Sequence, residues 1–156
     1  MFYTYVETPI GPLLVAGDEQ RLRTVHFAPS HPESGWKKAD EPFARIASQL
    51  AEYFEGKRRT FDVELQMEGT PFQLEVWSAL RGIPYGEVRS YADVARQIGR
   101  PKAVRAVGAA NGANPIPIIV PCHRVIGSSG ALTGFGGGLG VKRRLLELER
   151  GERRLL

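Results

Sequence analysis

Cys122 is the only cysteine in the 156-residue chain, and His123 follows it directly. The pair lies in the stretch NPIPIIVPCHRVIG, residues 114–127, behind a run of aliphatic side chains. A cysteine becomes a nucleophile when a neighbouring base or positive charge favours the thiolate, and an imidazole can serve as that base. These residue types fit nucleophilic chemistry at sulfur. A small, inert cysteine buried in a core fits the same pattern equally well.

Adjacency in sequence does not by itself bring the thiol and the imidazole together. In an extended chain, neighbouring side chains point to opposite sides, so we expect a bridging water between Cys122 and His123 rather than direct contact. A carboxylate should hold the imidazole in its productive tautomer. Glu147 and Glu149, on the last predicted helix, are the candidates, and their spacing does not choose between them.

Several classes of protein are disfavoured by composition. One cysteine cannot form an internal disulfide, and with three histidines it gives no CxxC or HxxxH spacing, so no metal site is expected. A papain-like protease needs a histidine well after the cysteine, and none follows His123. The chain has no apolar run of about 18 residues and no signal-peptide pattern at its start. We therefore expect a cytoplasmic protein without a membrane partner, where a free thiol survives.

The charge is mildly basic, with 21 Lys and Arg against 17 Asp and Glu and a net charge of +4. Between Arg81 and Arg105 six residues are basic and two are acidic. This distribution permits binding to nucleic acid without requiring it.

The first lobe reads as mixed α/β. Turn signals at residues 8–12 and 17–20 separate short strands between Phe2 and about Phe27, and residues 28–42 have the composition of a loop. Apolar residues at helical spacing predict a helix over 43–55, and the alternation in TFDVELQ predicts a strand over 60–66. No chemistry is expected in this lobe.

The second lobe reads as helical. Thr70, Pro71 and Gln73 form the start of a capped helix that ends at Gly82. Ser90 caps another helix, which runs to Gly99, and a third starts near Pro101. Two short helices joined by a Gly-containing turn match a helix-turn-helix, although an ordinary αα-hairpin has the same spacing.

The third of these helices and the segments after Cys122 have unusual compositions. The helix, AVRAVGAANGAN, has small side chains apart from Arg105, so it can approach a neighbouring backbone closely, whether of protein or of nucleic acid. Seven glycines in residues 127–140 predict a loop whose backbone amides can approach a ligand. A last helix is predicted over 141–150, with Val141, Leu145 and Leu148 facing the core.

The motifs PCHRVIG, RAVGAANGANP, PFQLEVW…IPYGEVRSY and LTGFGGGLGVKRRLLELE occur in an order and spacing that resemble the O6-alkylguanine-DNA alkyltransferases. Residues 69–149 resemble the family throughout, whereas TPIGPLLVAG and FDVEL resemble its N-terminal lobe more loosely. The resemblance implies a ribonuclease-H-like α/β domain over 1–68. It implies a mostly α domain over 69–156, with a helix-turn-helix that enters the minor groove of double-stranded DNA.

The resemblance also implies the reaction. The protein would flip an alkylated guanine out of DNA and transfer the alkyl group irreversibly to its own cysteine, once per molecule and without a cofactor, with O4-alkylthymine a second expected substrate. It would act as a monomer, with cooperativity on DNA left open. Two alternatives remain. One is a non-catalytic alkyltransferase-like lesion binder, disfavoured because those relatives replace the acceptor cysteine. The other is a transcription regulator, disfavoured by the small side chains of the third helix.

The resemblance assigns roles residue by residue. Cys122 is the acceptor, His123 its base through a water, Glu149 rather than Glu147 the carboxylate that orients His123, and Asn114 the brace of the active-site turn. Tyr91 assists nucleotide rotation and donates to the guanine ring. The DNA contacts are Arg105, which fills the stack, with Tyr91, Ala106 and Arg124. The pocket is formed by Val125, whose carbonyl reads the exocyclic amine, and by Pro117, Phe135 and Gly136.

The chain departs from family patterns at three points. Phe135 stands where some relatives have a tyrosine, so any contribution of that hydroxyl is absent. Gly136 replaces a serine of some members, which should matter little because a backbone N–H makes that contact. The N-terminal zinc site of some relatives needs cysteines that this chain lacks.

Overall fold

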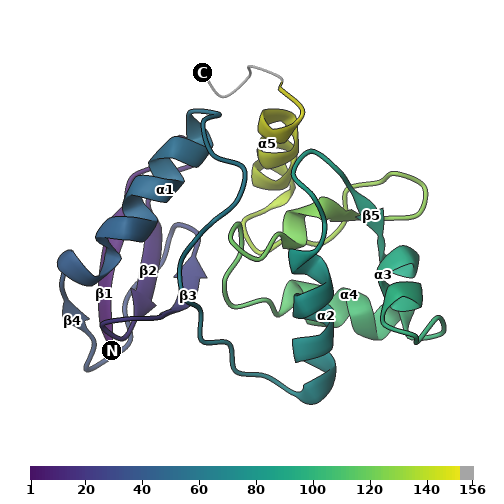
Figure 1. Cartoon of the computed structure of the whole chain (residues 1–156), viewed down its shortest axis with the longest axis horizontal. Helices are drawn as coiled ribbons and strands as arrows, with labels where there is room; N and C mark the ends of the chain where they lie inside the picture. The colour runs from purple at the N-terminus through teal and green to yellow at the C-terminus, as the bar shows by residue number, and fades with distance from the viewer. Residues whose placement is uncertain (152–156) are drawn as a thin grey trace.

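The computed structural model describes residues 1–151, arranged as an N-terminal lobe built on a β-sheet and a C-terminal lobe built mainly of helices (Figure 1). Within this described part, no helix is both long enough and apolar enough to cross a bilayer.

Four strands form the N-terminal sheet, in the order β3-β2-β1-β4. The strands β1 (Phe2–Val6), β2 (Leu13–Gly17) and β3 (Leu22–His26) pair antiparallel, while β4 (Lys37–Lys38) pairs parallel with β1. All five residues of β2 are buried, which explains why this strand is apolar without alternation. The expected strands between residues 2 and 27 are confirmed.

A short 3₁₀ turn, η1 (Glu41–Phe43), leads into α1 (Ala44–Phe54), which lies along the sheet (Figure 1). Its inner face carries Ile46, Leu50, Tyr53 and Phe54, all buried. The helix expected over 43–55 is therefore confirmed to within a residue at each end.

Two predictions for this lobe were wrong. Residues 60–66 form no strand; only Leu65 makes a single bridge, to Leu22. Phe61, Val63 and Leu65 pack partly buried against the core, which explains their alternation. The segment pairs with β3 only at Leu22, whose N–H donates to the Glu64 carbonyl and whose carbonyl accepts from the Gln66 N–H, both at 2.9 Å. In the predicted loop 28–42, Lys37 and Lys38 form β4 because their backbone reaches the free edge of β1.

The C-terminal lobe begins with two helices that start as expected. In α2 (Pro71–Arg81) Thr70 and Gln73 form a capping box, and in α3 (Tyr91–Gln97) Ser90 and Asp93 form another. The third helix, α4 (Val104–Gly112), starts three residues beyond Pro101, with no side-chain cap. The indole Nε1–H of Trp77 on α2 donates to the Ala110 carbonyl of α4 at 2.8 Å and holds these two helices together.

The remaining elements surround the cysteine. A 3₁₀ turn, η2 (Cys122–Arg124), precedes β6 (Val125–Ile126), which pairs parallel with β5 (Arg89–Ser90). The last helix, α5 (Leu139–Glu149), packs on η2 and stands between the lobes (Figure 1). Leu145 and Leu148 face the core as expected, but Val141 is only partly buried and Lys142 is fully buried instead.

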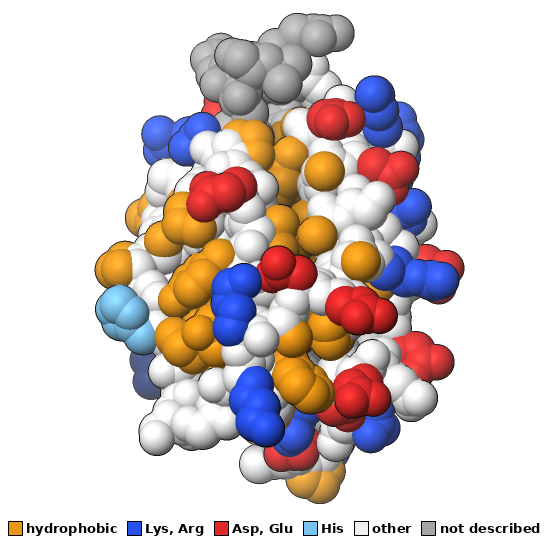
Figure 2. Space-filling view, turned by 90° about the vertical axis from the view of Figure 1, so that its left-hand side faces the viewer, with side chains coloured by type: hydrophobic (Ala, Val, Ile, Leu, Met, Phe, Trp, Pro, Cys, Tyr) orange, Lys and Arg blue, Asp and Glu red, His pale blue; other side chains and the backbone are white. Residues whose placement is uncertain are grey.

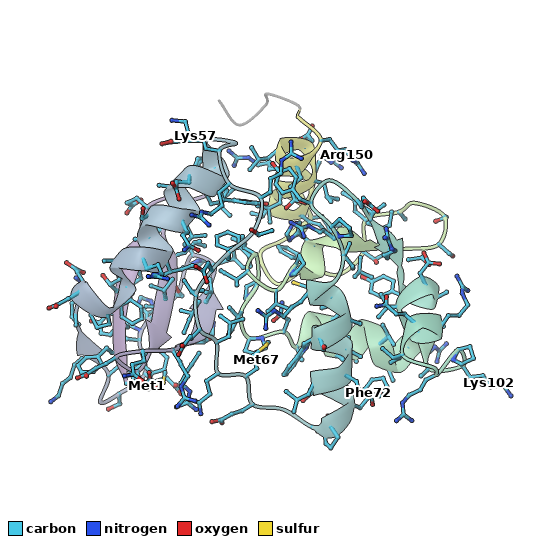
Figure 3. All side chains as sticks on the ribbon, viewed as in Figure 1. Met1, Lys57, Met67, Phe72, Lys102 and Arg150 are labelled. Carbon is cyan, nitrogen blue, oxygen red and sulfur yellow. The ribbon has the colours of Figure 1, made fainter. Side chains whose placement is uncertain are left out.

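One hydrophobic cluster runs through both lobes, from Leu13 and Leu50 in the first to Leu80 and Leu145 in the second. The backbone N–H of Val25 on β3 donates to the Pro115 carbonyl at 2.9 Å and adds a hydrogen bond between the lobes. Met67 lies in the segment that connects them (Figure 3). On the face presented by the N-terminal lobe, basic and acidic side chains are interspersed (Figure 2).

Candidate active site

Cys122 lies on the wall of a cavity of about 290 Å³ between the two lobes. The C-terminal lobe contributes Asn114, Pro117 and Phe135 to this wall, and the N-terminal lobe contributes residues 25–27, 29 and 30, among them Phe27. Only 5% of Cys122 is exposed, so a reacting group must enter the cavity to reach the sulfur.

The thiol of Cys122 is held in its neutral form. Burial raises the pKa of Cys122 to about 11, and the hydrogen bond with Asn114 and the charge of Lys142 offset this only in part. Because the thiolate and not the thiol is the nucleophilic form of cysteine, any reaction at this sulfur needs a base to take the proton.

His123, the next residue in the chain, is fully buried. The backbone at Cys122–Arg124 is a 3₁₀ turn and not the extended chain assumed above. The expectation that Cys122 and His123 are not in direct contact nevertheless agrees with the geometry. His123 Nδ1 is buried and has no hydrogen-bond partner among residues 1–151.

Glu149 forms a hydrogen bond with the other ring nitrogen of His123, with 2.7 Å between His123 Nε2 and Glu149 Oε2. Burial by itself would raise the pKa of Glu149, but the hydrogen bonds and charges of His123 and Arg124 outweigh it and keep this pKa well below its usual range. The ionised carboxylate can only accept, so Nε2 carries the hydrogen and Nδ1 has the free lone pair. Burial also lowers the pKa of His123, despite the opposing effect of Glu149, so the ring is neutral and able to take a proton.

Three further groups hold Glu149. The guanidinium of Arg124 makes two bonds to it, Nε to Oε1 at 2.8 Å and Nη2 to Oε2 at 2.9 Å, while Nη1 donates to the Ile83 carbonyl. Tyr53 donates its hydroxyl to Oε2 at 2.6 Å, and the Gly86 N–H reaches Oε1 at 3.5 Å. A buried carboxylate with this many donors is fixed in both position and charge.

Asn114 braces the turn before Cys122. Its Nδ2 donates to the Val120 carbonyl at 2.8 Å, and its Oδ1 accepts from the Ile116 N–H at 3.0 Å. Inside this turn Ile118 has a φ of 75°, a left-handed conformation that a β-branched residue adopts only under constraint from its surroundings. The side-chain bonds of Asn114 and the burial of Ile118 supply that constraint.

A buried lysine fixes the glycine-rich segment on the far side of the cavity. Lys142 Nζ donates to the Val125 carbonyl at 2.6 Å and to the Thr133 carbonyl at 2.9 Å. The Thr133 hydroxyl in turn donates to the Tyr91 hydroxyl at 3.0 Å. The ring of Phe135 packs against Phe27, with 5.3 Å between centroids. These contacts join α5, α3 and the N-terminal lobe through one loop.

Two family models match the chain. One is described as the 6-O-methylguanine DNA methyltransferase ribonuclease-like domain and covers residues 1–67, and the other is described as the DNA binding domain of the same protein and covers 71–151. Together they account for nearly all of the described residues. The chain belongs to the 6-O-methylguanine DNA methyltransferase family.

Individual members of this family are similar over most of their length. A methylated-DNA–protein-cysteine methyltransferase of Methanosarcina acetivorans is 53% identical, with 96% of this chain and 98% of the relative covered. One from Mycobacterium tuberculosis is 52% identical, with 95% and 92% covered. The crystal structure of Mycobacterium tuberculosis OGT in complex with DNA aligns with a TM-score of 0.95 at 50% identity, covering 99% of this chain and 97% of that one.

Most residues implied by the resemblance to this methyltransferase family lie around one cavity. Pro117, Phe135 and Gly136 line it together with Cys122 and Asn114. His123 and Glu149 lie behind the cysteine, and Glu147 is not the residue that contacts the histidine. Tyr91 reaches the neighbouring loop through Thr133, and Val125 is buried with its carbonyl bound to Lys142.

The expected DNA contacts divide into two groups. Arg105 and Ala106 are exposed on α4. Arg124 is only 6% exposed, and its guanidinium is engaged by Glu149 and the Ile83 carbonyl. In this structure the charge of Arg124 is used inside the protein to hold the carboxylate, and a contact of Arg124 with DNA stays a prediction.

Residues outside the predicted set also belong to the site. The first lobe was expected to carry no chemistry, yet Tyr53 bonds Glu149, and residues 25–27, 29 and 30 wall the cavity. A tyrosine on the apolar face of the helix predicted over 43–55 was a usable signal, because a buried hydroxyl needs a partner. Lys142 gave a similar signal, because a lysine beside the predicted core face of the last helix needs acceptors for its ammonium group if it is buried.

Proposed function

We propose that this protein repairs O6-alkylguanine in DNA by transferring the alkyl group to Cys122, and that O4-alkylthymine is a second substrate. The observation that carries the proposal is a lone thiol on a cavity wall with a buried, neutral imidazole and an ionised carboxylate behind it. Membership of a family whose relatives are named methylated-DNA–protein-cysteine methyltransferases supports the same reaction.

The reaction begins when the alkylated base enters the cavity. The Cys122 proton passes through a water to His123 Nδ1, and the resulting thiolate attacks the alkyl carbon. A carbon–sulfur bond forms as the carbon–O6 bond breaks, and its electron pair stays with the guanine. Tyr91 donates a hydrogen bond to the departing ring, which finally takes up one proton. The carboxylate of Glu149 stabilises the imidazolium in the meantime.

The transfer occurs once in the lifetime of each molecule. Its product is a thioether, which water does not hydrolyse and which lies outside the reversible oxidation states of cysteine. No cofactor or metal takes part, and the thiol must stay reduced, which fits a cytoplasmic protein.

The C-terminal lobe is proposed to bind double-stranded DNA as a helix-turn-helix, with α3 and α4 as its two helices, while the N-terminal lobe has a ribonuclease-H-like fold. Exposed α4 residues such as Ala106 and Ala109 allow close approach to the backbone in the minor groove. Arg105 fills the space left by the flipped nucleotide and offsets part of the cost of extrusion. Binding is by a monomer and largely independent of sequence, because phosphate contacts dominate.

Intact-mass measurement with an excess of an O6-methylguanine duplex tests this proposal. We expect a plateau at one added methyl per chain, located on Cys122. Cys122→Ser should keep DNA binding and lose methyl uptake completely. Adding Ser78→Cys to that variant provides a matched control, because an exposed thiol on α2 lacks the cavity and should stay unmodified. Continued release of repaired guanine, or methyl uptake by Cys122→Ser, would contradict the proposal.

A further inference from the structure

Tyr53 connects the N-terminal lobe to the catalytic carboxylate. It lies on α1, is 0% exposed, and donates its hydroxyl to Glu149 Oε2 on α5 at 2.6 Å across 96 residues of sequence. The C-terminal ends of α1 and α5 lie at the same end of the molecule, where Lys57 and Arg150 follow them (Figures 1 and 3). The lobe that carries neither the nucleophile nor its base therefore supplies a donor to the same site.

The position of this contact is specific. Tyr53 bonds Oε2, the carboxylate oxygen that also accepts from His123 Nε2 at 2.7 Å. The hydroxyl hydrogen and the imidazole hydrogen thus share one oxygen. When the Tyr53 hydroxyl donates to Oε2, it draws negative charge from that oxygen. The Nε2–H of His123 then donates to a less basic acceptor.

Tyr53 can act only as a donor here. Burial raises the pKa of Tyr53 well above its ordinary value, and the negative charge of Glu149 raises it further. The hydroxyl therefore keeps its hydrogen at every pH at which the protein works. By donating, it reduces the basicity of the carboxylate, so the Nε2 hydrogen stays on the ring and the lone pair stays on Nδ1.

The ring of Tyr53 is held in place by its own packing. It meets Phe54 and Tyr85 edge-on, at centroid distances of 5.1 and 6.3 Å, and tilts against Phe61 at 5.4 Å. A ring fixed on several sides presents its hydroxyl in one direction, so the hydrogen bond does not depend on a flexible side chain.

We propose that Tyr53 is a positioning residue of the methyl-transfer reaction, which sets the orientation and basicity of His123 through the shared oxygen of Glu149. This inference rests on the proposed function. It gives the N-terminal lobe a part in the reaction, because the C-terminal lobe alone cannot complete the donor set of the carboxylate.

Other charged and titratable groups face the same carboxylate and must be kept constant in a test. Arg124 bonds both carboxylate oxygens, and Lys142 lies near enough to His123 to lower its pKa. Tyr85 also senses the charge of Glu149, with Arg59 over its ring. Tyr53→Phe leaves all of these residues in the chain.

The test is the pH dependence of single-turnover methyl transfer by full-length Tyr53→Phe. This variant keeps the ring and loses only the donor. We expect the rate to fall about tenfold, as for loss of a hydrogen bond to a charged group. We also expect the acid limb of the profile to move to higher pH, because the carboxylate then stabilises the protonated imidazole more strongly.

Tyr85→Phe is the matched control. It deletes a hydroxyl beside the same carboxylate, and that hydroxyl forms no hydrogen bond with residues 1–151. Its acid limb should stay in place. A difluorotyrosine introduced at position 53 supplies the opposite perturbation, because a more acidic hydroxyl donates more strongly. It should move the acid limb to lower pH.

The outcomes are distinguishable. Opposite displacements of the acid limb by phenylalanine and difluorotyrosine support the proposal, since a purely structural tyrosine would not produce them. Unchanged profiles in both variants overturn it. If Tyr53→Phe does not fold, the difluorotyrosine protein alone decides in the same way. If the unmodified protein takes up no methyl group, the proposed function fails first, and the Tyr53 proposal fails with it.

Discussion

At the scale of single residues, the thiol of Cys122 and the imidazole of His123 are both held in their neutral forms. Cys122 is kept neutral by burial, so the thiol is not freely reactive before a substrate arrives. His123 is kept neutral as well, with its hydrogen directed at Glu149 and its free nitrogen on the other side of the ring. In the proposed reaction the thiolate therefore forms only when a proton can move from Cys122 to His123.

The buried neutral histidine predicts how stability depends on pH. The folded-state pKa of His123 lies below its ordinary value of 6.5, so the unfolded chain takes up a proton that the folded one refuses. The unfolding free energy should be unaffected by His123 above pH 6.5 and should fall below it, by up to about 1.4 kcal/mol per pH unit. Urea unfolding between about pH 5.5 and 7.5, a range above the ordinary pKa values of carboxylates, measures this slope.

Two variants isolate the contribution of His123 to that slope. His123→Gln can still donate to Glu149 but cannot titrate, so its slope over this range should be shallower. His31→Gln removes an exposed histidine and should leave the slope as it is. Equal slopes in the unchanged protein and in His123→Gln would show that the histidine is not held neutral by the fold.

At the scale of elements, the glycine-rich loop is held by contacts at both of its ends. Lys142 bonds the carbonyls of Val125 and Thr133, and Phe135 packs against Phe27. Gly137 completes this packing. A Cβ at that position would lie 2.9–3.1 Å from ring atoms of Phe27, closer than carbon atoms pack. Here the absence of a side chain permits contact between the lobes.

Gly137→Ala should therefore disturb both packing and catalysis. We expect a loss of about 1–3 kcal/mol in the free energy of unfolding, as for other overpacked sites, and slower methyl transfer because Phe27 and Phe135 wall the cavity. Gly140→Ala is the control. It has open space around it on α5 and should be neutral or slightly stabilising. Thermal unfolding and single-turnover rates measure both effects, and similar behaviour of the two variants would argue against the contact with Phe27.

At the scale of the whole molecule, two lobes enclose a cavity that neither could form alone. The cavity wall, the Tyr53–Glu149 bond and the shared hydrophobic cluster all cross between them. The side chains proposed to meet DNA lie elsewhere, on the C-terminal lobe. Three of the arginines in the basic segment 81–105 pair with nearby acids, in Arg89–Glu87, Arg96–Asp93 and Arg100–Glu75. Arg105 has no such ion pair among residues 1–151 and remains available for the duplex.

The proposed wedge predicts a substrate-dependent defect for Arg105→Ala. If this side chain occupies the space of the flipped nucleotide, its loss should slow methyl transfer from an O6-methylguanine duplex by about tenfold or more. Transfer from the free O6-methylguanine nucleoside needs no flipping and should keep its rate. Arg45→Ala, an exposed arginine on the N-terminal lobe, should affect neither reaction. Equal slowing with both substrates would assign Arg105 to the chemistry rather than to extrusion.

The sequence by itself determined the local structure of the C-terminal lobe. Thr70 with Gln73, and Ser90 with Asp93, specify helix starts through bonds within four residues, and both capping boxes are present. Local signals also located the strands before residue 27 and singled out Cys122 and His123. Such features are readable because the interacting groups are neighbours in the chain.

Only the tertiary structure decided which distant groups complete the site. Spacing left Glu147 and Glu149 equal as partners of His123, and only the resemblance to relatives chose Glu149. The partner of Tyr53 lies 96 residues away, and the guanidinium of Arg124 lies against a carboxylate that no local pattern joins to it. The strand expected over 60–66 is reduced to one bridge between Leu65 and Leu22 on the edge strand β3, because how far two distant segments run side by side is set by the fold and not by the alternation. Burial of charge then sets the pKa values, and burial is a property of the assembled fold.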